Sequence, residues 1–196
     1  MPSKDMEGGE TNARLMALVQ QGDMPAFGRL YEKYGDFVDH AILSIAPSLS
    51  RSEVEDLCHD VFLAIRKGAL KYKEEGRLKS WIYSYAIRIT KQYRRKWAIR
   101  RRILGMVKGQ RVAISGTEHV APDVGAMLRL DTGRILEQLP EIQRQVLVLY
   151  EQDGLRGKEI GELLGMNVNT VWTHLRRARS ELTTRLKRSS TRGGAR

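Results

Sequence analysis

The helical period of the apolar residues is the feature that most limits how this chain can fold. Apolar side chains recur every three or four positions from residue 12 to about residue 102, and again from about residue 128 to residue 187. No stretch shows the strict alternation of a half-buried strand. Two of the expected core stripes are formed by Phe27, Leu30, Tyr31, Tyr34, Val38 and Ile42, and by Val54, Leu57, Val61 and Ile65. The sequence therefore predicts an all-α protein.

The same pattern divides the chain into two helical domains and a segment between them. Residues 103–127 contain four glycines, one proline and no sustained period, which is typical of a flexible linker. We therefore predict a first helical domain over residues 12–102, a linker over 103–127 and a second helical domain over 128–188. A chain of 196 residues with 41% hydrophobic residues is long enough for two small cores.

Charge and cysteine content narrow the class of protein. With 34 Lys and Arg against 23 Asp and Glu, the net charge of +11 favours an anionic partner such as nucleic acid or a membrane surface. No apolar run approaches the roughly 20 residues needed to cross a bilayer, and the first residues do not resemble a secretory signal. A single cysteine, Cys58, excludes an intrachain disulfide and is expected to be a small buried side chain. We expect a cytoplasmic protein without membrane insertion.

Residues 158–182 have the spacing of a helix-turn-helix. Gly165 is placed to end the first helix in a left-handed conformation, Asn167 can cap the second helix, and Gly161 would allow the two helices to cross closely. The predicted core face of the second helix comprises Val168, Val171, Leu175, Ala178 and Leu182. Its other face carries Asn169, Thr170, Trp172, Thr173, Arg176, Arg177 and Arg179. Such a helix can enter the major groove of DNA, although a helical hairpin with a solvated basic face has the same pattern.

Trp172 is the unusual member of that second face. It directly follows the core position Val171, and the sequence offers no intramolecular reason for it. We expect it either to present an apolar face to a thymine methyl group or to anchor a contact with the first domain or a partner protein.

A second basic region lies in the first domain. Residues 71–111 hold fourteen Lys and Arg against two acids. Aromatic residues are interleaved with them: Tyr72, Trp81, Tyr83, Tyr85, Tyr93 and Trp97. Cations neutralise phosphates and aromatic faces stack on unpaired bases, so this combination suits single-stranded nucleic acid. Trp81 is better explained as part of the core, because it is four residues from Tyr85.

Catalytic motifs are not apparent. The four histidines are dispersed, and neither a glycine-rich phosphate loop nor an H-E-x-x-H site occurs. Asp56, His59 and Asp60 share a helix face and could be metal ligands, which leaves a nucleic-acid-processing enzyme as one alternative. A solvated or partner-facing acidic patch explains them better. We expect no enzymatic activity, no metal, no cofactor and no small-molecule substrate.

A domain suited to single strands, joined to a separate duplex-binding motif, resembles a promoter-opening factor. The segments "EVEDLCHDVFLAIRK", "YKEEGRLKSWIYSYAIRITKQYRRK" and "LEQLPEIQRQVLVLYEQDGLRGKEIGELLGMNVNTVWTHLRRARSEL" resemble domains two and four of the extracytoplasmic-function (ECF) sigma factors, in the sigma-70 superfamily of bacterial RNA polymerase sigma factors. The resemblance covers nearly the whole chain. It implies an alternative sigma factor that binds core RNA polymerase, directs it to promoter DNA and helps to melt the minus-ten region.

The resemblance also implies roles for individual residues. Docking on the clamp coiled coil of the polymerase beta-prime subunit would involve Asp56, Leu57, Asp60, Phe62 and Leu63. The minus-ten element would be bound by Tyr72, Lys73, Arg77, Lys79, Arg88, Lys91, Gln92, Arg94 and Arg95. The minus-thirty-five element would be bound by the helix-turn-helix, with Trp172, Thr173, Arg176 and Arg177 in the major groove and Thr170 and Arg179 near phosphate. Asn169 is a further expected contact with this element. Further expected partners are the polymerase beta flap and a separate anti-sigma factor.

Three positions depart from the family pattern and leave the promoter sequence open. Arg88 and Gln92 stand where the family usually has Asn and Asp, and Trp172 stands where a basic residue is common. A transcriptional regulator that binds operator DNA without polymerase, through the same helix-turn-helix, remains the alternative from another class.

Overall fold

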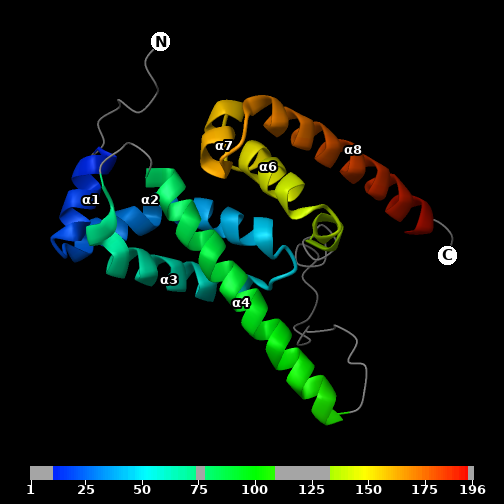
Figure 1. Cartoon of the computed structure of the whole chain (residues 1–196), viewed down its shortest axis with the longest axis horizontal. Coiled ribbons are helices and arrows are strands. Elements are labelled where there is room, and N and C mark those ends of the chain that lie inside the picture. The colour runs from blue at the N-terminus through cyan, green and yellow to red at the C-terminus, as the bar shows by residue number, and fades with distance from the viewer. Residues whose placement is uncertain (1–10, 74–77, 109–132, 194–196) are drawn as a thin grey trace.

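The computed structural model describes residues 11–73, 78–108 and 133–193. Within these residues every regular element is a helix, as Figure 1 shows. The elements are α1 (Asn12–Gln20), α2 (Met24–Ile45), α3 (Arg51–Gly68), the short 3-10 helix η1 (Ala69–Lys71), α4 (Leu78–Lys108), a helical turn over 133–137, α6 (Glu141–Glu151), α7 (Gly157–Leu164) and α8 (Val168–Gly193). The prediction of an all-α protein is confirmed. No described helix is both long and apolar enough to cross a bilayer.

Side-chain caps fix where the first helices begin. Thr11 accepts a hydrogen bond from the Arg14 backbone N–H at the start of α1, and Asp23 does the same for Ala26 at the start of α2. At the start of α3, Ser50 and Glu53 form a reciprocal capping box. Because each cap satisfies backbone donors that the helix leaves free, it favours one starting residue over its neighbours.

The first domain packs α3 and α4 against the long helix α2. Leu30, Val38 and Ile42 of the predicted stripe are fully buried, and Ile65 of α3 and Ile82 of α4 meet them in the same core. Cys58 is buried as expected, and desolvation raises the pKa of its thiol to about 12. The apolar stripes therefore decide which helix faces form the core.

The second domain is the three-helix unit α6, α7 and α8. Its core contains Val146 and Leu149 of α6, Ile160 of α7, and Val171 and Leu175 of α8. In Figure 1, α8 runs beside α6, and α6 lies against α2. The two domains are thus in contact in this arrangement.

Polar contacts join the two domains near the start of α6 and just beyond its end, and the apolar core is continuous between them. Arg144 of α6 is buried and donates to the carbonyl oxygens of Ser44 (2.5 Å) and Ile45 (3.1 Å), at the end of α2. At the far end of α6, Nδ1 of His40 lies 2.7 Å from Oδ1 of Asp153. These contacts join the side of α2 to α6 and the loop that follows it.

Helix α4 is longer than the sequence predicted. The predicted linker began at residue 103, but the helix continues to Lys108, and its last part projects away from the other helices (Figure 1). Gly105, counted as a linker residue, lies inside this helix, because a single glycine costs only about 1 kcal/mol in a long helix. The rest of the predicted linker, residues 109–127, lies outside the described residues.

Candidate nucleic-acid interface

The turn between α7 and α8 has the geometry of a helix-turn-helix. Gly165 ends α7 with φ of 68°, in the left-handed region, and the N–H of Met166 bonds the carbonyl of Gly161 at 2.8 Å. A Cβ on Gly161 would lie 2.7 Å from the carbonyl oxygen of Met166, so only glycine fits there. The Asn167 side chain accepts from the Asn169 N–H at 2.9 Å. The predicted roles of Gly165 and Asn167 are confirmed. Gly161 differs from its prediction, because it makes room for the turn backbone at Met166, and the nearest α8 atom is the Val168 nitrogen, 3.7 Å away.

The outer face of α8 presents most of the predicted duplex-binding side chains to solvent. Asn169, Thr170, Arg176 and Arg177 are exposed, whereas Thr173 is half-buried and its hydroxyl donates to the Asn169 carbonyl at 2.9 Å. Val171, Leu175 and Ala178 are buried on the opposite side, whereas Val168, which was predicted for the same core face, is 37% exposed at the start of the helix. The helix is therefore anchored by one face and free on the other, as insertion into a groove requires.

Trp172 and Arg179 have intramolecular partners that the sequence did not reveal. The Trp172 ring meets the Tyr150 ring of α6 edge to face, with centroids 5.7 Å apart, although 44% of the residue remains exposed. Arg179 also lies over the Tyr150 ring, 5.1 Å from its centroid, and donates twice to Oε1 of Glu151, at 2.9 and 2.7 Å. The expectation that Trp172 lacks an intramolecular reason is wrong, because α6 ends beside it.

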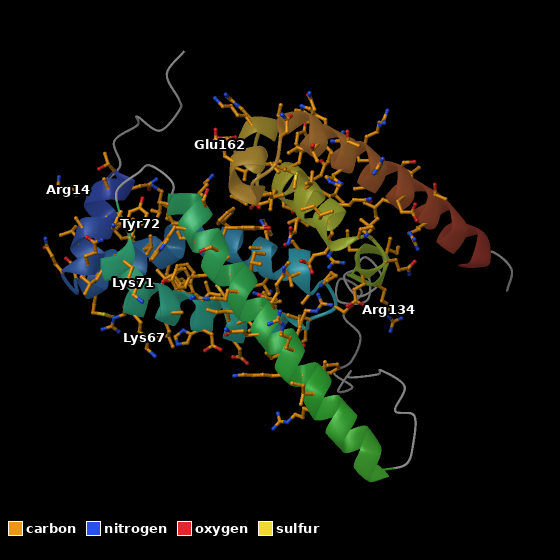
Figure 2. The ribbon with its side chains drawn as sticks, in the orientation of Figure 1. Arg14, Lys67, Lys71, Tyr72, Arg134 and Glu162 are labelled. Atoms are coloured by element: carbon orange, nitrogen blue, oxygen red, sulfur yellow. The ribbon has the colours of Figure 1, made fainter. Side chains whose placement is uncertain are left out.

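On α4, the predicted minus-ten residues form an exposed, mostly cationic surface. Lys79, Arg88, Lys91, Gln92, Arg94 and Arg95 are all exposed, as is Lys73 before the helix, and Arg77 lies outside the described residues. Figure 2 shows Lys71 and Tyr72, with Arg14 and Lys67, at the end of the molecule where α4 begins. Cations thus extend from the loop before α4 along the helix.

Tyr72 was predicted to stack on an unpaired base, but in the structure its ring is buried. It is only 8% exposed, and its ring lies 5.2 Å from that of Trp81, which in turn meets Tyr85 at 4.8 Å. Trp81 is half-buried and packs on the core, which confirms its structural role. In this arrangement the Tyr72 ring belongs to the core and offers no free face to a base.

Two of the α4 cations are engaged by the second domain. Lys91 pairs with Glu141 of α6 at 2.9 Å, and Arg94 lies 3.7 Å from the same carboxylate. Arg94 also donates to the Ile45 carbonyl at 2.9 Å. A shallow cavity of about 410 Å³ lies between these groups, lined by Ile45, Pro47, Arg94, Glu137, Leu139, Glu141 and Arg144.

The predicted polymerase-docking residues of α3 separate into two groups. Asp56 and Asp60 are exposed and Leu63 is half-buried, whereas Leu57 and Phe62 are 3% and 1% exposed and belong to the core. The prediction must be corrected for Leu57 and Phe62, because helical periodicity turns them toward α2. The face available to a partner is acidic, with Leu63 at its edge.

Sequence reasoning missed the residues that join the domains. Arg144 stands between Gln143 and Gln145, before the apolar run "VLVLY", so its immediate neighbours in the sequence do not indicate that it is buried. The carbonyls it bonds are those of Ser44, Ile45, Leu136 and Leu139. No sequence pattern indicated the contact between His40 and Asp153, because 113 positions separate the two residues.

Comparison with known proteins gives the family. A family model described as sigma-70 region 2 matches residues 30–103, and one described as sigma-70, region 4 matches residues 129–182. The chain is 25% identical over 190 residues to the ECF RNA polymerase sigma-E factor of Escherichia coli strain K12, covering 88% of this chain and 92% of that one. It is 30% identical over 144 residues to the ECF RNA polymerase sigma factor ShbA of Streptomyces griseus, covering 71% of this chain and 75% of that one.

Solved structures show the same fold. The structure of CnrH in complex with the cytosolic domain of CnrY superposes with a TM-score of 0.65 at 20% identity, covering 88% of this chain and 95% of that one. The sigma factor RpoE in complex with the anti-sigma factor NepR from Bartonella quintana gives 0.57 at 18% identity, covering 82% and 96%. With both conserved regions matched in order, and with a relative at 30% identity, this chain belongs to the ECF sigma factors of RNA polymerase.

Proposed function

We propose that this alternative sigma factor binds core RNA polymerase through the acidic face of α3, holds the separated minus-ten strand on the cations of α4, and places α8 in the major groove of the minus-thirty-five element. The observation that carries the proposal is the division of surface chemistry. One chain presents an exposed acidic helix face, an exposed basic helix and an exposed polar recognition helix on three separate elements.

Each surface matches its proposed partner by charge and shape. The carboxylates of Asp56 and Asp60 are free to pair with a basic protein surface. Lys79, Arg88 and Arg95 can neutralise phosphates. Arg176 and Arg177 project from a helix whose opposite side is buried, so they can reach base edges and backbone in a groove.

An anti-sigma factor is a further proposed partner. The solved RpoE structure is a complex with the anti-sigma factor NepR, and RpoE shares the fold of this chain. We extend that relationship to this protein by family membership. The beta flap of the polymerase is the proposed contact of the second domain, again by family.

Reconstitution tests the proposal directly. The full-length chain is mixed with purified core polymerase and a promoter library, and transcripts are selected and sequenced. We expect initiation from one promoter class only when both proteins are present. Specific duplex binding by the chain alone, with no initiation after core is added, would favour the operator-binding regulator instead.

A further inference from the structure

Trp172 is a large, mostly apolar side chain on α8 that remains 44% exposed. Its indole touches the two other helices of the second domain. It meets Tyr150 at the end of α6, and it covers Gly157 at the start of α7. A side chain that contacts both neighbours of a recognition helix can fix the orientation of that helix.

The Trp172 ring leaves no space for a side chain at position 157. A Cβ built on Gly157 would lie 2.6 Å from Cζ2 and 2.9 Å from Cε2 of Trp172, closer than real Cβ atoms approach their neighbours. The residue is buried and its φ is not in the left-handed region, so the backbone itself does not require glycine. The indole ring is therefore the reason that position 157 has no side chain.

Arg179 extends the contact by two turns of α8. Its guanidinium lies over the Tyr150 ring and bonds Glu151, so Tyr150 contacts both Trp172 and Arg179. Edge-to-face aromatic pairs and cation–π contacts add to the stability that burial provides. Both α8 residues point along the flank of the helix toward α6, and Arg176, between them in sequence, remains exposed without a partner that the structure shows within the described residues.

We propose that Trp172 is a positioning residue. With Tyr150, Gly157 and Arg179 it fixes the orientation of α8 relative to α6 and α7, and Arg176 contacts one base pair of the promoter and determines which base is preferred there. The proposal rests on the proposed function, and it assigns promoter specificity to Arg176, while Trp172 acts through the orientation of the helix. A guanidinium must meet guanine O6 and N7 in a fixed geometry, so a small rotation of α8 weakens that contact before it weakens phosphate contacts.

A stability cycle tests the packing. Thermal unfolding is measured for the full-length wild type, Gly157→Ala, Trp172→Ala and the double variant. We expect Gly157→Ala alone to lower Tm by about 4 °C or more. With Trp172 truncated, the same methyl group has room, and Gly157→Ala should be neutral or stabilising. Equal losses in both backgrounds would overturn the contact.

Promoter selection with core polymerase tests the positioning role. We expect Arg176→Ala to relax discrimination at one base pair by about 5-fold or more. Trp172→Ala should relax discrimination at the same base pair although Arg176 is intact. The double variant Trp172→Ala with Arg176→Ala should show no further relaxation there. Trp172→Phe, which keeps an aromatic edge against Tyr150, should retain discrimination. Leu182→Ala is the matched control: it removes a half-buried α8 side chain packed on the core and should lower Tm without relaxing that base pair.

Two outcomes of the selection would overturn the proposal. If Trp172→Ala alters a different base pair, additively with Arg176→Ala, the indole itself contacts bases. If discrimination is unchanged, the contact is structural only. Should the wild type direct no initiation with core, the proposed function has failed; the same variants are then compared by selection of duplexes bound by the full-length chain alone, where the same two outcomes apply.

Discussion

At the scale of single residues, buried polar atoms decide how the two domains meet. The Arg144 guanidinium bonds four carbonyl oxygens, two from the end of α2 and two from the turn before α6. Burial lowers the pKa of this guanidinium from its usual value, which shows the cost of desolvating it. Without this group the carbonyls of Ser44 and Leu139 would lose a donor, whereas those of Ile45 and Leu136 also accept from Arg94 and from the Leu139 N–H.

Replacing Arg144 with methionine should therefore destabilise the protein. Methionine fills similar space but leaves buried carbonyls unpaired, and a group of this kind costs about 1–3 kcal/mol. Urea denaturation measures the loss in free energy of unfolding. Arg134→Met, at an exposed arginine labelled in Figure 2, is the control and should change stability little. Equal stability of the two variants would contradict the role given to Arg144.

At the scale of elements, each helix that carries a proposed surface is built in the same way. One face is apolar and buried, and the opposite face is charged: the middle of α3 is acidic around Asp56 and Asp60 and its two ends are basic, whereas the exposed charges of α4 and of the outer side of α8 are basic. Because the buried face fixes the orientation of the helix, charges on the other face can be changed without removing core contacts.

Charge reversal on α3 tests the docking surface. The double variant Asp56→Lys and Asp60→Lys should bind core polymerase at least about 10-fold more weakly, because opposite-charge contacts become repulsive. Its Tm should stay close to that of the wild type, since both residues are exposed. Glu32→Lys with Glu162→Lys makes the same change in net charge on other exposed sites and should bind core normally. Undiminished binding by the α3 variant in a pull-down would remove this face from the interface.

Salt dependence tests the basic face of α4. Arg95→Gln should impair open-complex formation and reduce the slope of log K against log salt concentration by about 0.7 to 1, because one fewer counterion is displaced. Arg95 suits this test better than Arg94, whose guanidinium already bonds the Ile45 carbonyl. Arg51→Gln, an exposed arginine at the start of α3, should leave the slope unchanged. A slope equal to that of the wild type in Arg95→Gln would argue against a phosphate there.

At the scale of the whole molecule, the contact between the domains contains a titratable pair. The hydrogen bond to Asp153 is the main cause that raises the pKa of His40, and the nearby Asp36 and Asp39 act in the same direction, whereas burial opposes them. We call the arrangement in which α6 lies against α2 the closed arrangement. Because the pKa of His40 is raised there, protonation of His40 favours the closed arrangement over one in which the domains are apart. The stabilisation is complete below the ordinary histidine pKa of about 6.5 and is lost as pH rises through the raised value.

The two domains should therefore separate more readily above pH 8 than at pH 6. Small-angle X-ray scattering of the full-length chain measures this as a larger radius of gyration at the higher pH. His40→Gln cannot be protonated, and its radius should depend less on pH. A variant with the same pH dependence as the wild type would show that another group is responsible.

Much of the fold follows from the sequence, because local spacing determines it. The apolar stripe of α2, the left-handed Gly165 and the cap at Asn167 depend on residues a few positions apart. All were predictable, except that Tyr31 of the predicted stripe is 39% exposed. The contacts of Trp172 and Arg144 could not be predicted from the sequence, because the residues they meet are brought close only by the packing of helices in space. Leu57 and Phe62 were placed on a surface by family resemblance, although the periodicity of Leu57 already put it in the core.

Glu141 gives the closed arrangement a consequence for DNA affinity. Its carboxylate pairs with Lys91 and lies near Arg94, which are two of the cations proposed to hold the minus-ten strand. A phosphate that takes these cations must displace Glu141, so strand binding and separation of the domains are linked equilibria. By reciprocity, whatever draws the second domain away from α2 raises the affinity of α4 for DNA by the same factor by which DNA favours the open form. In the isolated protein, Glu141 would then compete with DNA phosphates for Lys91 and Arg94. Its affinity for single-stranded DNA would therefore be lower than that of the form bound to polymerase.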